Sequence, residues 1–437
     1  MPVSWTRAST GLDRSVLHNV ASLYGAHMVN YVVPLATIPY LVRTLGVSAW
    51  GLVAMAQGFG AYLGLVVEYG FNFSATREVA RHWNSPERIR ELLAGVTGAK
   101  LFLATIGIAL AAALQGVVPN LQDHAAVLWA GVASGVALGM NPLWYFQGRE
   151  RMRVAAGLDM GAKLAAACGI FVFVHRPEDA WRVLALQAAG SILATGMGLV
   201  LAYRETPWLR PTVALAMDAL RTGWTMFLFR SSAMLYTSGN AFLLGLFAPA
   251  ESVGYFAGAE KISKAFMGML NPFNQALYPR ISRLVKQNSG DAARLFRTNV
   301  LVVGAGGLAL GAAVLVGAPV LVRVLLGAAL MPAVPVLRLL AILPPLIGLN
   351  TVVASQWMMP QGMDRTLNTV ILSAGLLNIS LAAALAPRYQ HMGMAGAVVG
   401  AELFVGLTCW YLVIRRRTRS ESPARVDLVL PDLENPA

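Results

Sequence analysis

The chain has 437 residues, of which 57% are hydrophobic and only 13% charged, and its mean hydropathy is +0.59. Soluble domains carry about 25% charged residues, so this composition excludes an ordinary soluble enzyme, and the apolar content excludes intrinsic disorder. The net charge of +13 would ordinarily suggest nucleic-acid binding. That interpretation needs basic patches interleaved with aromatic residues, whereas here the cations separate apolar runs, so we expect no nucleic-acid partner.

Taken in chain order, the apolar runs predict an all-α membrane protein with about twelve transmembrane helices. A helix needs about 20 mainly apolar residues to cross a bilayer. Uncharged intervals of that length are 15–42, 44–67, 101–122, 124–148, 183–203, 231–250, 298–322, 339–363 and 366–387. Three further stretches have the right length but contain charges: 154–174, 253–279 and 392–414.

The distribution of basic residues predicts the orientation of these helices. Twelve spans place both termini on one side, and most of the 34 Lys and Arg residues fall in the connections on that side. Because basic residues concentrate in cytoplasmic loops, we expect both termini in the cytoplasm. The connections on the opposite side are short, so no external domain is expected.

A polar segment near the middle of the chain divides it into two halves of six helices. The predicted organisation is an N-terminal lobe at 1–203, a cytoplasmic linker at 204–220, a C-terminal lobe at 221–417 and a disordered cytoplasmic tail at 418–437. Residues 50–56 resemble residues 253–259 at an offset of 203 positions. Two lobes of equal span count would form a parallel pseudo-repeat, a design found in transporters. Chance similarity between helices rich in Gly and Ala is the alternative.

Proline residues inside the spans predict bent helices. Proline removes a backbone hydrogen bond, and a membrane tolerates the kink where neighbours or a water-filled cavity satisfy the freed carbonyl. The alternative is that proline is simply more frequent in membrane helices. The residues concerned are Pro34, Pro39, Pro142, Pro272, Pro279, Pro344 and Pro345.

Two acid–base pairs lie inside predicted spans. Asp159 precedes Lys163 by four residues, and Glu260 precedes Lys264 by four residues. An acid four residues before a base is the favourable intrahelical arrangement, so these residues are either self-neutralising pairs or part of a cavity lining.

Other intramembrane charges have no such neighbour. Arg230 and Lys261 are the best candidates for cations that line a cavity, which implies an anionic, phosphorylated or carboxylated ligand. Glu68 and Glu402 are acids that either carry a coupling proton or pair with an arginine elsewhere. Lys100, early in the third span, is expected to extend toward the cytoplasm.

Sequence motifs of enzymes are missing. The chain has no phosphate-binding loop of the Gly-x-x-x-x-Gly-Lys type, no Gly-x-Ser-x-Gly and no His-Glu-x-x-His. Cys168 and Cys409 lie in apolar stretches and are expected to be inert core thiols. We therefore expect neither a catalytic residue nor a metal site nor a cofactor.

Three segments, 69–81, 141–152 and 253–281, resemble Wzx-type polysaccharide flippases, which transport O-antigen or exopolysaccharide units. That family belongs to the superfamily of the multidrug MATE exporters and the MurJ-like flippases. The resemblance extends over nearly the whole chain, including the number of spans and their orientation.

The resemblance implies a function and a set of residues. Such proteins lie in the bacterial inner membrane and move an undecaprenyl-diphosphate-linked oligosaccharide from the cytoplasmic to the periplasmic leaflet. They do so by alternating access of two lobes arranged as a V, driven by a proton or sodium gradient. Membrane lipid, a polysaccharide polymerase and a chain-length regulator are the implied partners. By motif, the residues carried over are Arg77, Glu78, Arg81, Gln147, Glu150, Glu260 and Lys261, with Arg149 beside them at the inner mouth. The alternative for the mouth arginines is a purely topological role.

Three other functions are weighed against this one. A MATE-type small-molecule exporter coupled to protons would be expected to carry an acid in its first helix, and none is present at 15–42. A MurJ-like lipid II flippase would have two additional helices. A membrane-bound polysaccharide polymerase or ligase would need a large outer loop.

Overall fold

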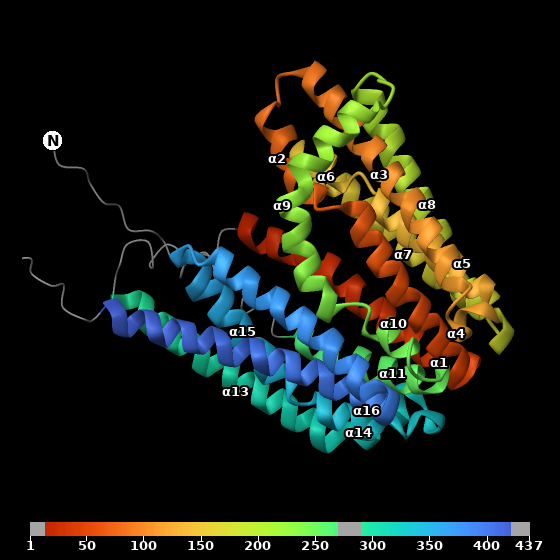
Figure 1. Ribbon diagram of the computed structural model, residues 1–437, viewed down its shortest axis with the longest axis vertical. Coiled ribbons are helices and arrows are strands. Elements are labelled where there is room, and N and C mark those ends of the chain that lie inside the picture. The colour runs from red at the N-terminus through yellow and green to blue at the C-terminus, as the bar shows by residue number, and fades with distance from the viewer. Residues whose placement is uncertain (1–13, 270–289, 421–437) are drawn as a thin grey trace, which may run out of the picture.

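The computed structural model describes the backbone of residues 14–269 and 290–420 and, with few exceptions, the side chains from residue 36 onward. Every regular element in this part of the chain is a helix. Figure 1 shows the helices in two arms that meet at one end and diverge toward the other. One arm holds α3, α5, α7 and α8, and the other holds α13 to α16.

The first arm begins with a helix that doubles back on itself. α1 spans Arg14–Glu68 and reverses at Gly46, whose φ of 76° lies in the left-handed region that glycine adopts without steric cost. The remaining helices of this arm are α2 (Phe71–Arg81), α3 (Pro86–Gln115), α4 (Pro119–Gln122), α5 (Ala125–Met140), α6 (Leu143–Gly148), α7 (Met152–Phe173), η1 (Pro177–Asp179) and α8 (Ala180–Glu205).

The second half of the chain ends with a helix that, like α1, reverses its direction. α16 spans Asp364–Ser420 and reverses at Gln390. The preceding helices are α9 (Val213–Thr237), α10 (Asn240–Gly245), α11 (Ala250–Gly268), α13 (Gly290–Leu321), η2 (Val322–Leu326), η3 (Ala328–Leu330), α14 (Ala333–Leu340), α15 (Leu343–Thr351), η4 (Val352–Met358) and η5 (Met359–Gln361).

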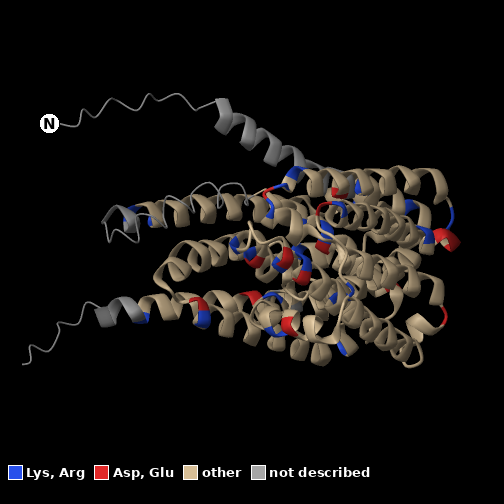
Figure 2. Ribbon diagram, turned by 90° about the horizontal axis from the view of Figure 1, so that it is seen from above, with Lys and Arg blue, Asp and Glu red and all other residues tan. Residues whose placement is uncertain are grey.

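The helices confirm the predicted fold class. Eight helical stretches within the described residues are long and apolar enough to cross a membrane. Two of them, Ala36–Arg81 and Asp364–Arg415, contain the reversals and so hold parts of two predicted spans each. α9 and α11 occupy the positions of the seventh and eighth predicted spans. Figure 2 shows that charged residues interrupt the ribbons at few places.

The proline predictions have mixed outcomes. α5 ends at Met140 and α6 begins at Leu143, so the chain is broken at Pro142 as expected. Pro344 and Pro345 instead lie in the first turn of α15, where the missing N–H has no helical partner to lose. α1 continues through Pro34 and Pro39, whereas Pro272 and Pro279, like the tail from 421 onward, lie outside the described residues.

The two arms are joined where the second half of α1 packs against α11. A Cβ atom added at Gly51 would overlap the carbonyl oxygen of Ala250, and one added at Gly254 would overlap the carbonyl oxygen of Val47. Position 47 corresponds to 250, and 51 to 254, at the offset of 203 residues, so the two contacts are reciprocal under the predicted repeat. Only glycine permits so close an approach of two helix backbones.

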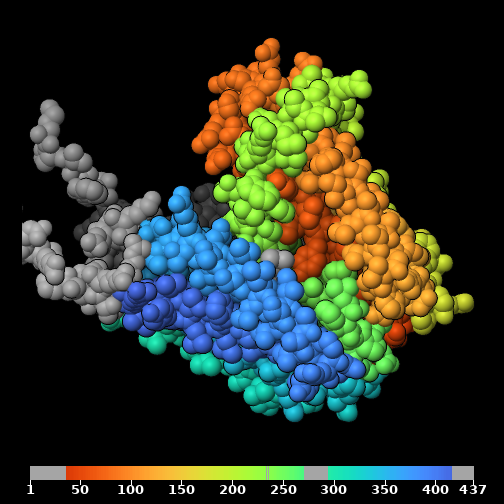
Figure 3. Space-filling model, viewed as in Figure 1, coloured from red at the N-terminus to blue at the C-terminus, as the bar shows by residue number. Residues whose placement is uncertain are grey.

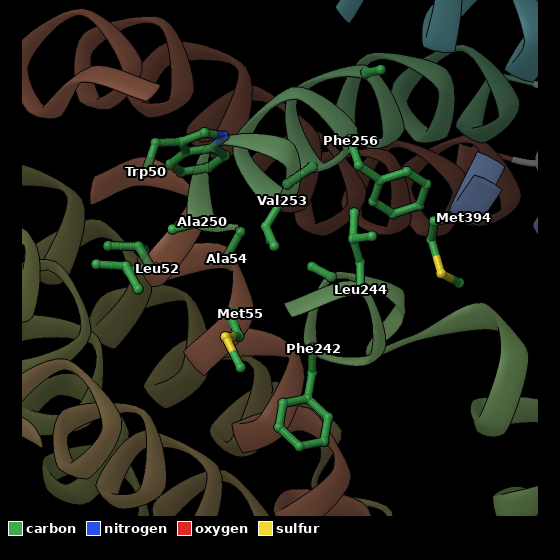
Figure 4. Packing of buried hydrophobic residues seen from close by; sticks show 14 of the residues in the cluster. Trp50, Leu52, Ala54, Met55, Phe242, Leu244, Ala250, Val253, Phe256 and Met394 are labelled. Atoms are coloured by element: carbon green, nitrogen blue, oxygen red, sulfur yellow. The ribbon is translucent and has the colours of Figure 1, made fainter. Parts of the chain in front are cut away.

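Large apolar side chains surround this junction. Trp50, Met55, Val253 and Phe256 are buried there, and Figure 4 shows them together with Met394 of α16. The resulting cluster contains residues from both arms. Because the cluster is continuous across the junction, the arms share one hydrophobic core at this end.

α9 passes from one arm to the other. Near its start Leu215 lies against Gly95 of α3, and further along the ring of Phe227 stacks on Tyr69 at 4.5 Å between centroids. α9 is also in contact with α16 of the second arm. Figure 3 shows the surface hollowed beside α9, with residues of α1 visible at the bottom. The division into lobes at 203 and 221 stays a prediction.

Candidate functional site

A cavity of about 650 Å³ lies within the second arm. Its walls come from α9, α10, α11, α14, α15 and both halves of α16. Most lining residues are apolar, and a small number of polar side chains face the same space, as is typical of ligand-binding sites. These polar residues include Tyr236, Asn240, Glu260, Lys264, Asn350 and Glu402.

On one wall, the predicted pair of Glu260 and Lys264 is present. The Lys264 ammonium lies 3.0 Å from the Glu260 carboxylate and also donates a hydrogen bond to the carbonyl oxygen of Thr237 at 3.0 Å. Asn240 Nδ2 donates to the same carboxylate at 3.2 Å. The pair therefore ties α11 to the break between α9 and α10, and its charges compensate each other.

On another wall, Glu402 is bound by an amide and not by a cation. Glu402 is only 5% exposed. Asn350 Nδ2 donates to Glu402 Oε2 and to its backbone oxygen, both at 3.0 Å. No ion pair to Glu402 is present among the described residues. A lone carboxyl group in such a place is costly to ionise, which makes it a candidate for reversible protonation.

A second polar centre lies where α1 ends beside α9. Glu68 Oε2 is 3.9 Å from Arg230 Nε, and the guanidinium carbon of Arg230 lies 5.4 Å from the centroid of the Phe73 ring. Glu68 Oε1 accepts a hydrogen bond from the Asn72 backbone N–H at 2.9 Å. Arg230 thus has a partner that sequence spacing could not reveal, and Glu68 pairs with an arginine from a distant helix.

Lys100 adds a third charge to this centre, and its expected position was wrong. The side chain does not extend to a membrane surface; Lys100 is 1% exposed and its ammonium donates to the carbonyl oxygen of Asn141 at 2.9 Å. That carbonyl follows the end of α5, where the helix dipole favours a cation. The Glu68 carboxylate is close enough to attract the Lys100 charge.

Lys261, on α11, is half-buried and lies near Glu260 and Lys264. In the part of the chain that the structure describes, its ammonium forms no ion pair or hydrogen bond. Neither Lys261 nor Arg230 is among the residues that line the 650 Å³ cavity. Their role in binding an anion stays a prediction.

The pair of Asp159 and Lys163 has a different setting. The two charges are 2.7 Å apart on α7, and both side chains keep about 40% of their surface exposed: 40% for Asp159 and 44% for Lys163. Cys168, on the same helix, is exposed, contrary to the expected core position, whereas Cys409 is buried. Neither Asp159 nor Lys163 lines the 650 Å³ cavity.

The residues of α2 and α6 that the family resemblance singled out lie together, because these two helices pack against each other. Thr76 Oγ1 donates to Gln147 Oε1 at 3.3 Å. Glu78 lies 3.3 Å from Arg81 and 3.6 Å from His82.

Arginines surround the same region. Arg149 Nη1 donates to the carbonyl oxygen of Trp83 at 3.2 Å, and its guanidinium lies 5.3 Å from the Trp83 ring centroid. Glu150 adopts a positive φ of 56° at the turn into α7. Arg77 and Arg81 are exposed. These residues form a basic rim at one end of the first arm.

Sequence reasoning missed the amides and the aromatic ring of these centres. Asn240, Asn350 and Phe73 were not singled out, although a polar amide inside an apolar run is a detectable signal. No cluster of three or more metal-ligating side chains occurs in the described residues.

Comparison with known proteins now decides the family. Residues 16–285 match the family described as "Polysaccharide biosynthesis protein". The chain belongs to this family. It is 30% identical over 394 residues, 90% of its length and 95% of the relative's, to a putative O-antigen transporter of Escherichia coli K12. A putative O-antigen transporter of Shigella dysenteriae is 27% identical over 398 residues, 89% of this chain and 98% of the relative. The resemblance drawn from three motifs is confirmed.

Solved structures show the same fold. The lipid II flippase MurJ in an inward closed conformation superposes with a TM-score of 0.69 and 14% identity, over 91% of this chain and 87% of that one. An inward-facing multidrug MATE transporter of the MOP superfamily gives 0.63 at 14% identity, over 90% of this chain and 100% of that one. At this identity the likeness concerns architecture and leaves substrates open. As a polysaccharide biosynthesis protein with this fold, the chain is a multi-pass membrane protein.

Proposed function

We propose that this protein is a flippase that moves undecaprenyl-diphosphate-linked oligosaccharide units from the cytoplasmic to the periplasmic leaflet of the bacterial inner membrane, for surface polysaccharide such as O-antigen. In this function the protein is a transporter and not an enzyme. Its family and its O-antigen transporter relatives support this function. The observation that carries it is the pair of polar centres inside an otherwise apolar helical structure, one of which contains two basic side chains and one acid.

The positive-inside rule supports an orientation with both termini cytoplasmic. In that orientation the glycine-packed junction of α1 and α11 closes the periplasmic end, and the basic rim around Arg149 faces the cytoplasm. Alternating access would then part the junction and close the opposite end. The charged headgroup would travel between the arms while the lipid tail stays in the bilayer.

We further propose that Glu402 couples transport to a proton gradient. Its carboxyl group is buried, lines the cavity and has an amide as its partner. Protonation would remove a charge that the surroundings do not compensate. A polymerase and a chain-length regulator are the partners that would use the translocated units.

The function is tested by deleting the gene and measuring surface polysaccharide. We expect lipid-linked units to accumulate on the cytoplasmic leaflet and surface polysaccharide to be lost, with both restored by the full chain. Unchanged surface polysaccharide in the deletion strain would refute the proposal. Unchanged polysaccharide together with increased drug sensitivity would indicate a small-molecule exporter.

Coupling is tested in proteoliposomes with an imposed pH gradient. Glu402→Gln should lower gradient-stimulated transport by about tenfold or more, since a fixed neutral side chain cannot carry a proton. Transport down a substrate gradient should persist in this variant. Glu91→Gln, which removes an exposed acid of α3, is the matched control. A wild-type response to the pH gradient in Glu402→Gln would exclude Glu402 as the proton carrier.

A further inference from the structure

The carboxylate of Glu68 is held in place independently of Arg230. Its Oε1 accepts the Asn72 backbone N–H at 2.9 Å, just after the Tyr69–Gly70 break that separates α1 from α2. The Glu68 side chain is only 10% exposed. An incoming ligand therefore cannot easily displace this carboxylate. Glu68 is a fixed group against which the side chain of Arg230 can be oriented.

The guanidinium of Arg230 is fixed on two sides and open on the rest. Its Nε is buried and faces Glu68 Oε2 at 3.9 Å, too far for a hydrogen bond. Its carbon lies over the Phe73 ring at 5.4 Å. The Arg230 side chain nevertheless keeps 38% of its surface exposed, and that surface belongs to atoms other than Nε. The planar fork of an arginine binds phosphate oxygens through its Nη edge.

Glu68 interacts with two basic side chains at this centre. It lies 3.9 Å from Arg230 of α9, and its carboxylate also acts electrostatically on Lys100 of α3. Among the described residues no other acid forms an ion pair with Arg230 or Lys100. Lys100 is fully buried and its ammonium is directed to the Asn141 carbonyl oxygen. The basic side chain that remains accessible is therefore Arg230, and its one acidic partner among the described residues is Glu68.

We propose that Glu68 is a positioning residue, which together with Phe73 holds the Arg230 guanidinium so that its exposed edge binds a phosphoryl group of the transported lipid. This rests on the proposed function, because the phosphoryl group is that of the lipid-linked substrate. Glu68 thereby has a role distinct from the one proposed for Glu402: it orients a guanidinium instead of carrying the coupled proton. A Glu68 that only neutralised Arg230 would instead weaken anion binding, and its removal would strengthen it.

The test measures binding of farnesyl diphosphate and farnesyl monophosphate to the purified full chain in detergent. Glu68→Gln should weaken diphosphate binding about tenfold, because the guanidinium loses its orientation. Arg230→Lys, which keeps the charge but not the fork, should have a similar effect. The double variant should be no weaker than Arg230→Lys alone, since coupled residues are not additive. The preference for diphosphate over monophosphate should fall in each variant.

Phe73→Leu keeps the test decisive if the Glu68 variant does not fold. Phe73 is 49% exposed, and its loss should weaken diphosphate binding about threefold through the missing cation–π contact. Glu91→Gln, from an exposed ion pair, should bind as the wild type does. Unchanged or tighter binding by both Glu68→Gln and Phe73→Leu, or additive effects in the double variant, would overturn the proposal.

The outcomes separate this inference from the proposed function. If the wild type binds farnesyl diphosphate and restores surface polysaccharide but the Glu68 and Phe73 variants bind as tightly, only the positioning role fails. If the wild type neither binds the diphosphate nor restores polysaccharide in the deletion strain, the flippase proposal fails as well.

Discussion

Two buried acids, one in each half of the chain, have opposite surroundings. Glu68 is 8% exposed and has Arg230 and Lys100 beside it, whereas Glu402 is 5% exposed and is bound by the Asn350 amide. Burial is nearly equal, so the difference lies in the partners. A nearby guanidinium offsets the cost of burying a carboxylate more than a neutral amide donor does.

The difference suggests a division of work between the two regions. The centre around Glu68 contains a partly exposed guanidinium and suits an anionic ligand. The centre around Glu402 contains a buried carboxyl group with no cation beside it among the described residues, which suits the proposed proton carrier. A transporter that exchanges one for the other needs both properties, and separate locations allow each to be adjusted without disturbing the other.

The largest effect on stability is expected at Lys100. Lys100→Met should lower the free energy of unfolding by about 3 kcal/mol, because the Asn141 carbonyl and Glu68 both lose a buried partner. Unfolding in mixed micelles measures this loss. Lys163→Met, in an exposed pair, should lose less than about 1 kcal/mol. Equal losses in the two variants would show that the Glu68 centre is no more charge-dependent than the surface.

The two acids themselves should respond differently to neutralisation. Glu68→Gln should cost about 2 kcal/mol of stability, since two cations are left without their carboxylate. Glu402→Gln should stay within about 0.5 kcal/mol of the wild type, because a glutamine oxygen still accepts from Asn350. Thermal unfolding of both variants under one condition makes the comparison. The reverse order would contradict the stronger dependence of the Glu68 centre on its carboxylate.

A smaller effect is expected from removing the amide. Asn350→Ala deletes both hydrogen bonds to Glu402 and should cost about 1.5 kcal/mol. Asn350→Ala in the Glu402→Gln background should cost about as much, since the amide also bonds the backbone. A negligible cost in either background would mean that Asn350 does not hold Glu402 in place.

The smallest effect is expected on α7. Asp159→Asn breaks an exposed pair and should change the free energy of unfolding by less than about 0.5 kcal/mol, with transport unaffected beyond that. Unfolding in mixed micelles measures the stability of this variant, and proteoliposomes measure its transport. A marked loss of transport at normal stability would add Asp159 to the substrate path and extend the comparison to a third centre.

The sequence predicted the features that depend on local pattern. Long apolar runs determined the spans, and a spacing of four residues predicted both the Asp159–Lys163 and the Glu260–Lys264 contacts. The pairing of Glu68 with Arg230 could not be predicted, because it joins helices far apart in the chain.

Lys100 shows a second limit. A lysine near a predicted span end extends to the surface by default, yet here α3 begins at Pro86, well before the predicted start at 101, so Lys100 lies in the helix interior. The break of α9 after Thr237 was missed for a similar reason. Hydropathy predicts which residues enter the membrane, but it does not predict where a helix bends.

The reciprocal glycine contact has a consequence for the history of the chain. Gly51 meets Ala250, and Gly254 meets Val47, at equivalent positions of the two halves. Self-complementary contacts of this kind are what a two-fold dimer possesses by symmetry. The junction therefore has the geometry expected if a half-length ancestor first paired with itself and later fused.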